Sequence, residues 1–217
     1  MPDSDENIHP ADAFKALNQI FDVDPRNEDI EIATWHESIA RITLVNTTPK
    51  VVKQLFENAK NIALYSYFSY RLHQPAEVIG YTALEKALKL KYEQEKELIN
   101  VESIPKNLFD YMNIALEQGW ITDEGYESSH PLATSRVESK LLYKMIDEGL
   151  LQSGVPVPEP TFDEIIEEMR KMGIAKRRLH AGRHVRNELV HGSNALSASS
   201  IGTLNNIAEE INQIFKQ

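Results

Sequence analysis

The chain has 217 residues, of which 41% are hydrophobic and 26% are charged, and its net charge is −10. This length and composition suit a globular protein of one domain with an appendage, or of two small domains, and the acidity argues against a protein that coats nucleic acid non-specifically. The absence of cysteine excludes disulfides, a thiolate nucleophile and a cysteine-ligated zinc, and no apolar run approaches the roughly 18 residues of a membrane span.

Residues 1–49 are predicted to form an acidic N-terminal extension. Ten acidic and two basic residues fall within residues 1–37. Phe14, Leu17 and Phe21 share one helical stripe, which predicts a short helix over residues 11–21. The N-terminus lacks the basic and apolar regions of a signal peptide, and the chain lacks cysteine, so we expect a cytoplasmic protein without a membrane partner.

Residues 50–217 are predicted to form an all-α domain, because alternating strand patterns are scarce and no Asn-Gly or Asp-Gly turn occurs. The first long helix is expected after Thr48 as N-cap, with Pro49 in its first turn and apolar residues at helical spacing. Pro75 is expected to separate it from a second long helix, over residues 76–98.

The middle of the chain is predicted to be a helical insertion over about residues 100–135. A helix is expected there, with Ser103 as its cap, Pro105 in its first turn and Gly119 at its exit. A loop should follow over residues 119–134.

Three further helices are predicted from capping signals and periodicity. Ser135 with Glu138 and Thr161 with Glu164 each form a capping box, and the first of these helices should end near Gly149. The last helix is expected from about Ser199, with a regular apolar stripe that predicts a core position.

Residues 170–191 reverse the acidic balance of the chain. They hold seven basic residues against one acid, a local charge of +6. The basic residues are Arg170, Lys171, Lys176, Arg177, Arg178, Arg183 and Arg186. This concentration predicts a confined surface for an anion such as RNA or a nucleotide. A solvated helix face, or a contact with an acidic element of the chain, would also explain it.

The end of this basic stretch is predicted to be a helix that closes at Gly192. Asn187 and His191 are four residues apart, so they share a face, and Arg183 lies on the same stripe. Arg186 and His191 are five apart, about 140° around an ideal helix. Their side chains would reach one ligand only if the helix loosens at its end or if they contact the ligand from two sides.

Arg186, Asn187 and His191 spell Arg-Asn-x-x-x-His, which resembles the motif of the HEPN family. The resemblance covers about residues 50–217 and implies a bundle of about four to five helices, with residues 1–49 and about 100–135 as additions. Many members of that family are metal-independent endoribonucleases of toxin–antitoxin or phage-defence systems. In that family the motifs of two protomers meet across a homodimer interface, so the resemblance implies a homodimer. The toxin–antitoxin setting also implies an antitoxin-type protein partner.

The motif residues suit RNA cleavage by the 2′-hydroxyl of the substrate. His191 would act as general acid or base, Arg186 would stabilise the phosphorane, and Asn187 would orient one of them. The RNA backbone would be held by a second group of residues, with no cofactor or metal. These residues are Arg177, Arg178, Arg183 and His184. A second imidazole would come from the partner protomer or from His184.

Other interpretations remain open for the same residues. Asn187 and His191 would also suit a helix end, where the dipole favours a histidine, and Arg186 would also suit an ion pair. A non-catalytic module that binds RNA, a nucleotide or a protein is a further possibility. His180 and His184 have the spacing of two metal ligands, but the glutamate of a zinc hydrolase is missing and the nearby arginines repel a cation, so no metal is expected.

Overall fold

A computed structural model describes residues 12–99, 104–150, 155–190 and 200–216, with only the helical backbone at 188–190. Within these ranges the chain is all-helical and contains no strand, as the patterning predicted. None of the helices in these ranges combines the length and hydrophobicity needed to cross a bilayer.

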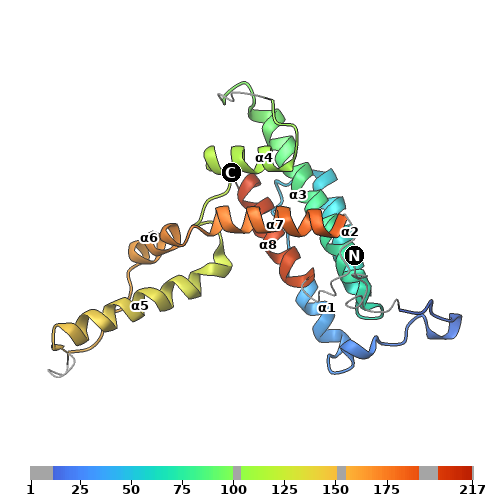
Figure 1. Cartoon of the computed structure of the whole chain (residues 1–217), viewed down its shortest axis with the longest axis horizontal. Coiled ribbons are helices and arrows are strands. Elements are labelled where there is room, and N and C mark those ends of the chain that lie inside the picture. The colour runs from blue at the N-terminus through green and yellow to red at the C-terminus, as the bar shows by residue number, and fades with distance from the viewer. Residues whose placement is uncertain (1–11, 100–103, 151–154, 191–199, 217) are drawn as a thin grey trace, which may run out of the picture.

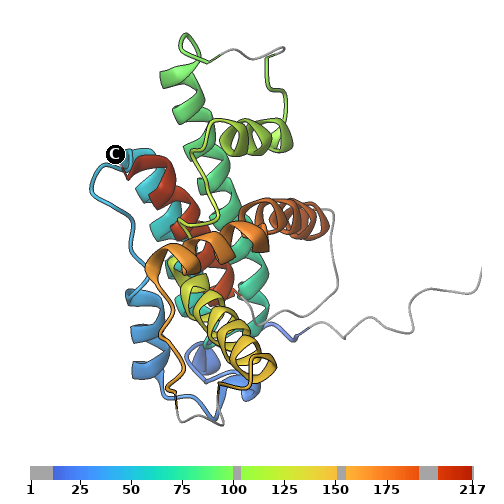
Figure 2. The same cartoon turned by 90° about the vertical axis from the view of Figure 1, so that its left-hand side faces the viewer.

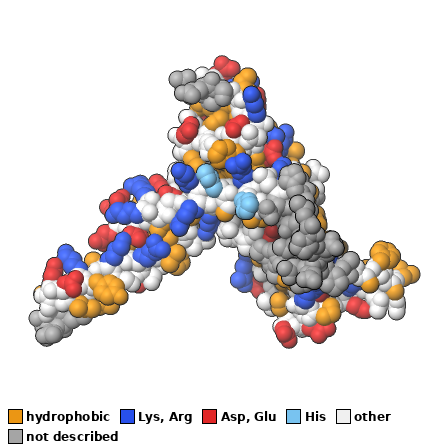
Figure 3. Space-filling model, viewed as in Figure 1, with side chains coloured by type: hydrophobic (Ala, Val, Ile, Leu, Met, Phe, Trp, Pro, Cys, Tyr) orange, Lys and Arg blue, Asp and Glu red, His pale blue; other side chains and the backbone are white. Residues whose placement is uncertain are grey.

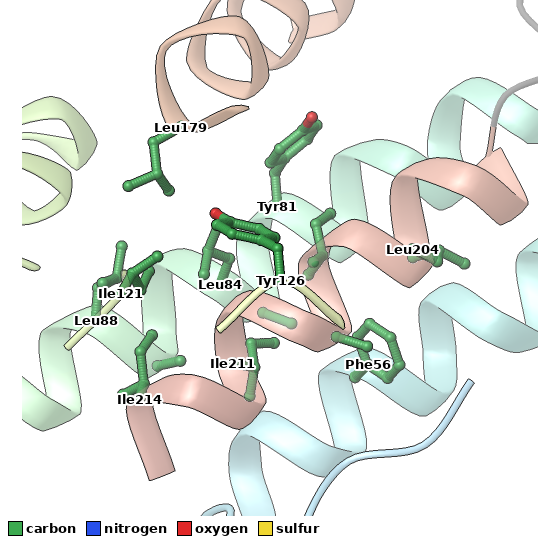
Figure 4. Packing of buried hydrophobic residues seen from close by; sticks show 14 of the residues in the cluster. Phe56, Tyr81, Leu84, Leu88, Ile121, Tyr126, Leu179, Leu204, Ile211 and Ile214 are labelled. Carbon is green, nitrogen blue, oxygen red and sulfur yellow. The ribbon is translucent and has the colours of Figure 1, made fainter. Parts of the chain in front are cut away.

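The centre of the bundle consists of α2 (Lys50–Tyr65), α3 (His73–Glu95) and α8 (Ser200–Phe215). Helix α3 packs against both of the others, and α7 (Ile174–Val190) crosses α3 and α4 (Leu108–Glu117) (Figure 1). Figure 4 shows apolar side chains from α2, α3, α7 and α8 meeting in one core. The apolar stripe predicted for the last helix is confirmed, because Leu204, Ile207, Ile211 and Ile214 are buried.

The segment before α2 packs onto the bundle. Trp35 of α1 (Ile32–Ala40) is buried and donates its indole N–H to the carbonyl oxygen of Ala63, at 3.2 Å. Ile39 and Ile42 belong to the same core, and the side-chain amide of Asn27 donates to the carbonyl oxygens of Ser66 and Tyr67. Part of the acidic N-terminal segment therefore shares the core of the bundle, and the boundary at residue 49 stays a prediction.

The helix predicted over residues 11–21 is wrong. Of its described residues, only the short 3₁₀ turn Leu17–Gln19 is helical, and Phe14, Leu17 and Phe21 are exposed. An isolated helix of this length is marginal in water, so it needs a partner for its apolar face. Phe21 meets the ring of Phe68 edge-on, but all three residues of the stripe stay exposed.

Several predicted helix starts are also corrected. Pro49, rather than Thr48, is the N-cap of α2, and Pro75 lies within the first turn of α3 instead of before it. Helix α5 (His130–Asp147) begins five residues before Ser135, with a proline in its first turn. Proline is tolerated in the first turn because its missing N–H would have no helical partner there.

The capping of α4 comes from a residue that the sequence analysis did not single out. Asn107 accepts hydrogen bonds from the backbone N–H groups of Phe109 and Asp110, and Asp110 completes a capping box. The predicted cap, Ser103, lies outside the described residues. Gly119 adopts φ 67° just beyond the helix, as predicted for its exit.

Helix α5 packs against α6 (Phe162–Met172), and the pair projects from the bundle as an arm (Figures 1 and 2). Arg136 and Lys140 of α5 form ion pairs with the buried Glu168 of α6. The predicted capping box of Thr161 with Glu164 is confirmed. Gly173 at φ 57° ends α6 and allows the chain to turn at once into α7. The arm is thereby joined directly to the basic helix.

Replacement of Gly182 by alanine tests the seating of α7 on α3. A Cβ atom at this position would lie 2.8 Å from the ring of Tyr81, so α7 would have to shift. We expect Gly182→Ala to lower the free energy of unfolding by about 1–3 kcal/mol in urea denaturation. Gly202→Ala is the matched control on α8, where nothing lies within 4 Å, and it should stabilise by about 0.5–1 kcal/mol. Equal effects of the two changes would contradict this packing.

Candidate nucleic-acid interface on helix α7

Helix α7 has one apolar and one basic side. Ile174, Ala175 and Leu179 are buried against the bundle, and Gly182 faces Tyr81 of α3. Their spacing leaves the opposite side of the helix in solvent. The exposed residues on that side are Lys176, Arg177, His180, Arg183 and His184. We call these five residues the basic face of α7, and Figure 3 shows Lys, Arg and His side chains gathered along this helix.

The lysine and the two arginines of the basic face have no carboxylate partner among the described residues. Within the part of the chain that the structure describes, Lys176, Arg177 and Arg183 form no ion pair. The guanidinium of Arg183 lies over the ring of Phe109 on α4, at 4.3 Å from its centroid, and the ring of His180 meets the same phenylalanine edge-on. Phe109 therefore holds two groups of the face in place without neutralising them.

Arg178 points to the opposite side and is engaged by the protein itself. Its guanidinium donates to Glu209 on α8 at 2.9 Å, and it also donates to the hydroxyls of Ser128 and Ser129. It lies 4.5 Å from the ring centroid of Tyr126 as well. These contacts give Arg178 a structural role, and the phosphate contact predicted for it stays a prediction.

Two of the three motif residues can be placed. One guanidinium nitrogen of Arg186 donates to the side-chain oxygen of Asn187 at 3.3 Å, and the other lies 3.5 Å from the carboxylate of Glu85 on α3. Both residues are half-buried. His191 and Gly192 lie outside the described residues, so the predicted approach of His191 to Arg186 stays a prediction.

The structure forms an ion pair between Arg186 and Glu85 of α3. Glu85 also binds Lys89 one turn away on α3, so it is shared between two cations. Glu85 partly offsets the charge of Arg186 and orients its guanidinium group from the side of α3.

His180 and His184 are both exposed on α7. Among the described residues, no group of three or more histidine, cysteine, aspartate or glutamate side chains is placed to hold a metal ion. The two histidines therefore have no third ligand in that part of the chain.

A cavity of about 200 Å³ lies behind α7, between α3 and α8. Glu210 of α8 lines it and is only 3% exposed, and the hydroxyl of Tyr126 donates to its carboxylate at 3.1 Å. Burial raises the pKa of Glu210 to about 7 and also raises the pKa of Tyr81. Glu210 was not predicted from the sequence, although an acid within the apolar stripe of the last helix was a signal for it.

Substitution of Arg178 separates its structural role from that of its neighbour. We expect Arg178→Ala to lower the free energy of unfolding by about 1–3 kcal/mol, because Glu209 loses its partner and Tyr126 loses the stacked guanidinium. Arg177→Ala removes the same charge one residue away, where the side chain is exposed, and should change stability by no more than about 0.5 kcal/mol. The free energy of unfolding of both variants is measured by urea denaturation. Similar losses of stability in the two variants would contradict the structural role of Arg178.

Glu210→Gln tests the buried carboxyl group through pH. Because its folded-state pKa is raised from 4.5 to about 7, the wild-type protein loses stability as pH rises through that interval, whereas glutamine stays neutral. We expect the variant to gain on the order of 3 kcal/mol over the wild type between pH 4.5 and pH 8 in urea denaturation. Glu117→Gln, at an exposed position, should follow the wild type throughout. If the stability of Glu210→Gln changed with pH in parallel with that of the wild type, a raised pKa of Glu210 would be refuted.

Comparison with protein-family models, with characterised proteins and with solved structures finds no match to this chain. The resemblance of the Arg-Asn-x-x-x-His motif to the HEPN family therefore stays a prediction.

Proposed function

We propose that this protein is a metal-independent endoribonuclease that binds the RNA backbone with the basic face of α7. The observation that carries the proposal is the set of exposed cations, Lys176, Arg177 and Arg183, which have no carboxylate partner among the described residues. The chain has an excess of acids, with a net charge of −10. Three such cations gathered on one helix face of such a chain fit an anionic ligand better than general solubility.

Binding would come from phosphate contacts along the basic face. Arginine offers a planar fork of donors to phosphate oxygens, and each phosphate that is neutralised releases counterions. Arg183 is already oriented over Phe109, which reduces the conformational entropy that it would lose on binding. His184 lies on the same face and would contact a neighbouring phosphate or the reacting one.

Cleavage would use the motif at the end of the helix. His191 takes the proton of the 2′-hydroxyl, the 2′-oxygen attacks phosphorus, and the bond to the 5′-oxygen breaks. A second imidazole protonates that leaving oxygen. Arg186 stabilises the charge on the phosphorane, and its contacts with Glu85 and Asn187 support such an orientation. The second imidazole comes from His184 or from His191 of a second protomer in a homodimer.

The cellular setting follows from the family resemblance. A HEPN-type ribonuclease in the cytoplasm would act as a toxin or a phage-defence effector, and an antitoxin-type protein would hold it in check. A second candidate function is a non-catalytic module that binds RNA, a nucleotide or a protein. It is favoured by the pairing of Arg186 with Glu85, because this pairing lowers the charge available for a transition state.

Cleavage assays in EDTA test the proposal. We expect His191→Ala to abolish RNA cleavage while the helical circular-dichroism spectrum is kept, and Arg186→Ala to weaken it comparably. Arg186→Lys should rescue only partly, because lysine cannot present a bidentate fork. The products should carry 2′,3′-cyclic phosphate ends. Cleavage that survives in His191→Ala would overturn the mechanism, and saturable binding without cleavage would select the non-catalytic module.

Binding assays over a range of salt concentrations test the surface separately. Arg177→Ala and Arg183→Ala should each weaken RNA binding and reduce the slope of log affinity against log salt by about one. Arg41→Ala is the matched control, because it removes an exposed arginine at the C-cap of α1 instead of one on α7. An equal loss in this control would show that net charge alone accounts for binding.

A further inference from the structure

The cavity behind α7 is open at one edge and has both polar and apolar side chains in its lining. It is lined from three helices by Tyr81, Arg178, Ala181, Gly182, Val185, Thr203, Asn206, Ile207 and Glu210. Ala181 and Val185 are exposed, so they form the side that meets solvent. Glu210 and Tyr81 are buried and form the interior. The absence of a side chain at Gly182 leaves room for the ring of Tyr81 against α7.

The polar groups of the cavity are only partly satisfied by the protein. Tyr126 donates to one oxygen of Glu210. The hydroxyl of Tyr81 and the side-chain amide of Asn206 have no hydrogen-bond partner among the described residues. Together with the buried carboxylate of Glu210, these two groups give the cavity hydrogen-bonding capacity for a small molecule that enters it.

Size and charge restrict that molecule. A volume of about 200 Å³ is smaller than the roughly 300–1,000 Å³ of sites for drug-sized ligands, so it suits one flat ring system. An ionised Glu210 at the wall repels phosphate. A neighbouring pocket shares Arg178 and Ala181 with the cavity and is also lined by Arg177. A phosphate group attached to a ligand in the cavity could therefore bind beside these arginines.

We propose that this cavity is a binding site for the guanine base. The carboxylate of Glu210 accepts from the ring N1–H and the exocyclic N2 amine, and Tyr81 and Asn206 donate to the O6 and N7 acceptors. Adenine places a ring acceptor beside its amine, so it cannot pair in this way with an ionised carboxylate. The source is a free guanine nucleotide or a guanine extruded from an RNA strand. Binding of a guanine extruded from RNA would extend the proposed function and rests on it, whereas binding of a free guanine nucleotide does not depend on it.

Guanine binding should be coupled to the ionisation of Glu210. The groups that face its carboxyl are Tyr126 from the loop before α5, Arg178 from α7, Tyr81 from α3 and Glu209 from its own helix. Burial raises the pKa of Glu210 to about 7, so the carboxyl is largely protonated at pH 6 and largely ionised at pH 8. Since the two guanine donors need an ionised acceptor, affinity should rise over this interval.

Titration of the full chain with GMP, IMP, AMP and UMP tests the site. We expect GMP to bind about tenfold or more tightly than the other three at pH 8. IMP is the sharpest comparison, because it lacks only the N2 amine. Glu210→Gln should reduce GMP affinity about tenfold and remove its dependence on pH. Equal binding of all four nucleotides, displaced by inorganic phosphate, would overturn the guanine site and leave RNA binding by α7 standing.

A matched pair of substitutions on α8 tests the site independently of any folding defect in Glu210→Gln. Asn206 lines the cavity, and Asn205 is exposed beside it on the same helix. Asn206→Ala should weaken GMP binding several-fold, and Asn205→Ala should leave it unchanged. An unchanged affinity in Asn206→Ala would count against the assigned geometry. Selective GMP binding by a protein that neither binds nor cuts RNA would uphold the site and refute the proposed function.

Discussion

The contact of Arg178 with Glu209 and with the ring of Tyr126 fixes how α7 lies on the bundle. It joins α7 to α8 and to the loop that precedes α5. With Arg178 turned inward and Gly182 seated against Tyr81, the opposite side of α7 must face solvent. The basic face and the cavity behind the helix are therefore two consequences of one orientation of α7.

The structure sorts the basic residues of this region into two groups. Arg170, Lys171, Arg178 and Arg186 each have a carboxylate within ion-pair distance. Lys176, Arg177 and Arg183 have none among the described residues. The exposed pairs of Arg170 and Lys171 contribute little to stability and mainly reduce the local charge, whereas the pair of Arg178 also holds α7 on the bundle. The second group is what remains for an external anion, and it lies along a single helix face.

The cavity gives the same region a second chemical property. Phosphate recognition by the basic face carries no sequence information, whereas a base edge does. Burial raises the pKa of Glu210 to about 7, and Tyr81 and Asn206 line the same cavity. Together, the two surfaces would allow the protein to hold a backbone on one side of α7 and to read a base on the other.

Much of the local structure follows from the sequence alone. The apolar stripe of α8, the Thr161 capping box and the glycine at the exit of α4 depend on residues within a few positions of one another, where spacing and side-chain type decide the conformation. The cluster of cations on one helix could be predicted for the same reason. The helix over residues 11–21 was predicted wrongly because its apolar stripe stays largely exposed, and the stripe itself does not reveal how little of it the bundle covers.

The tertiary structure decided which arginines are free and where the buried acid lies. Arg186 pairs with a carboxylate 101 residues earlier in the chain, and Tyr126 donates to an acid 84 residues later. Neighbouring positions such as Arg177 and Arg178 look alike in the sequence, yet one is exposed and the other is held by Glu209. Local spacing determines which side of a helix a residue occupies. Only the packing of α3, α7 and α8 determines what that side meets.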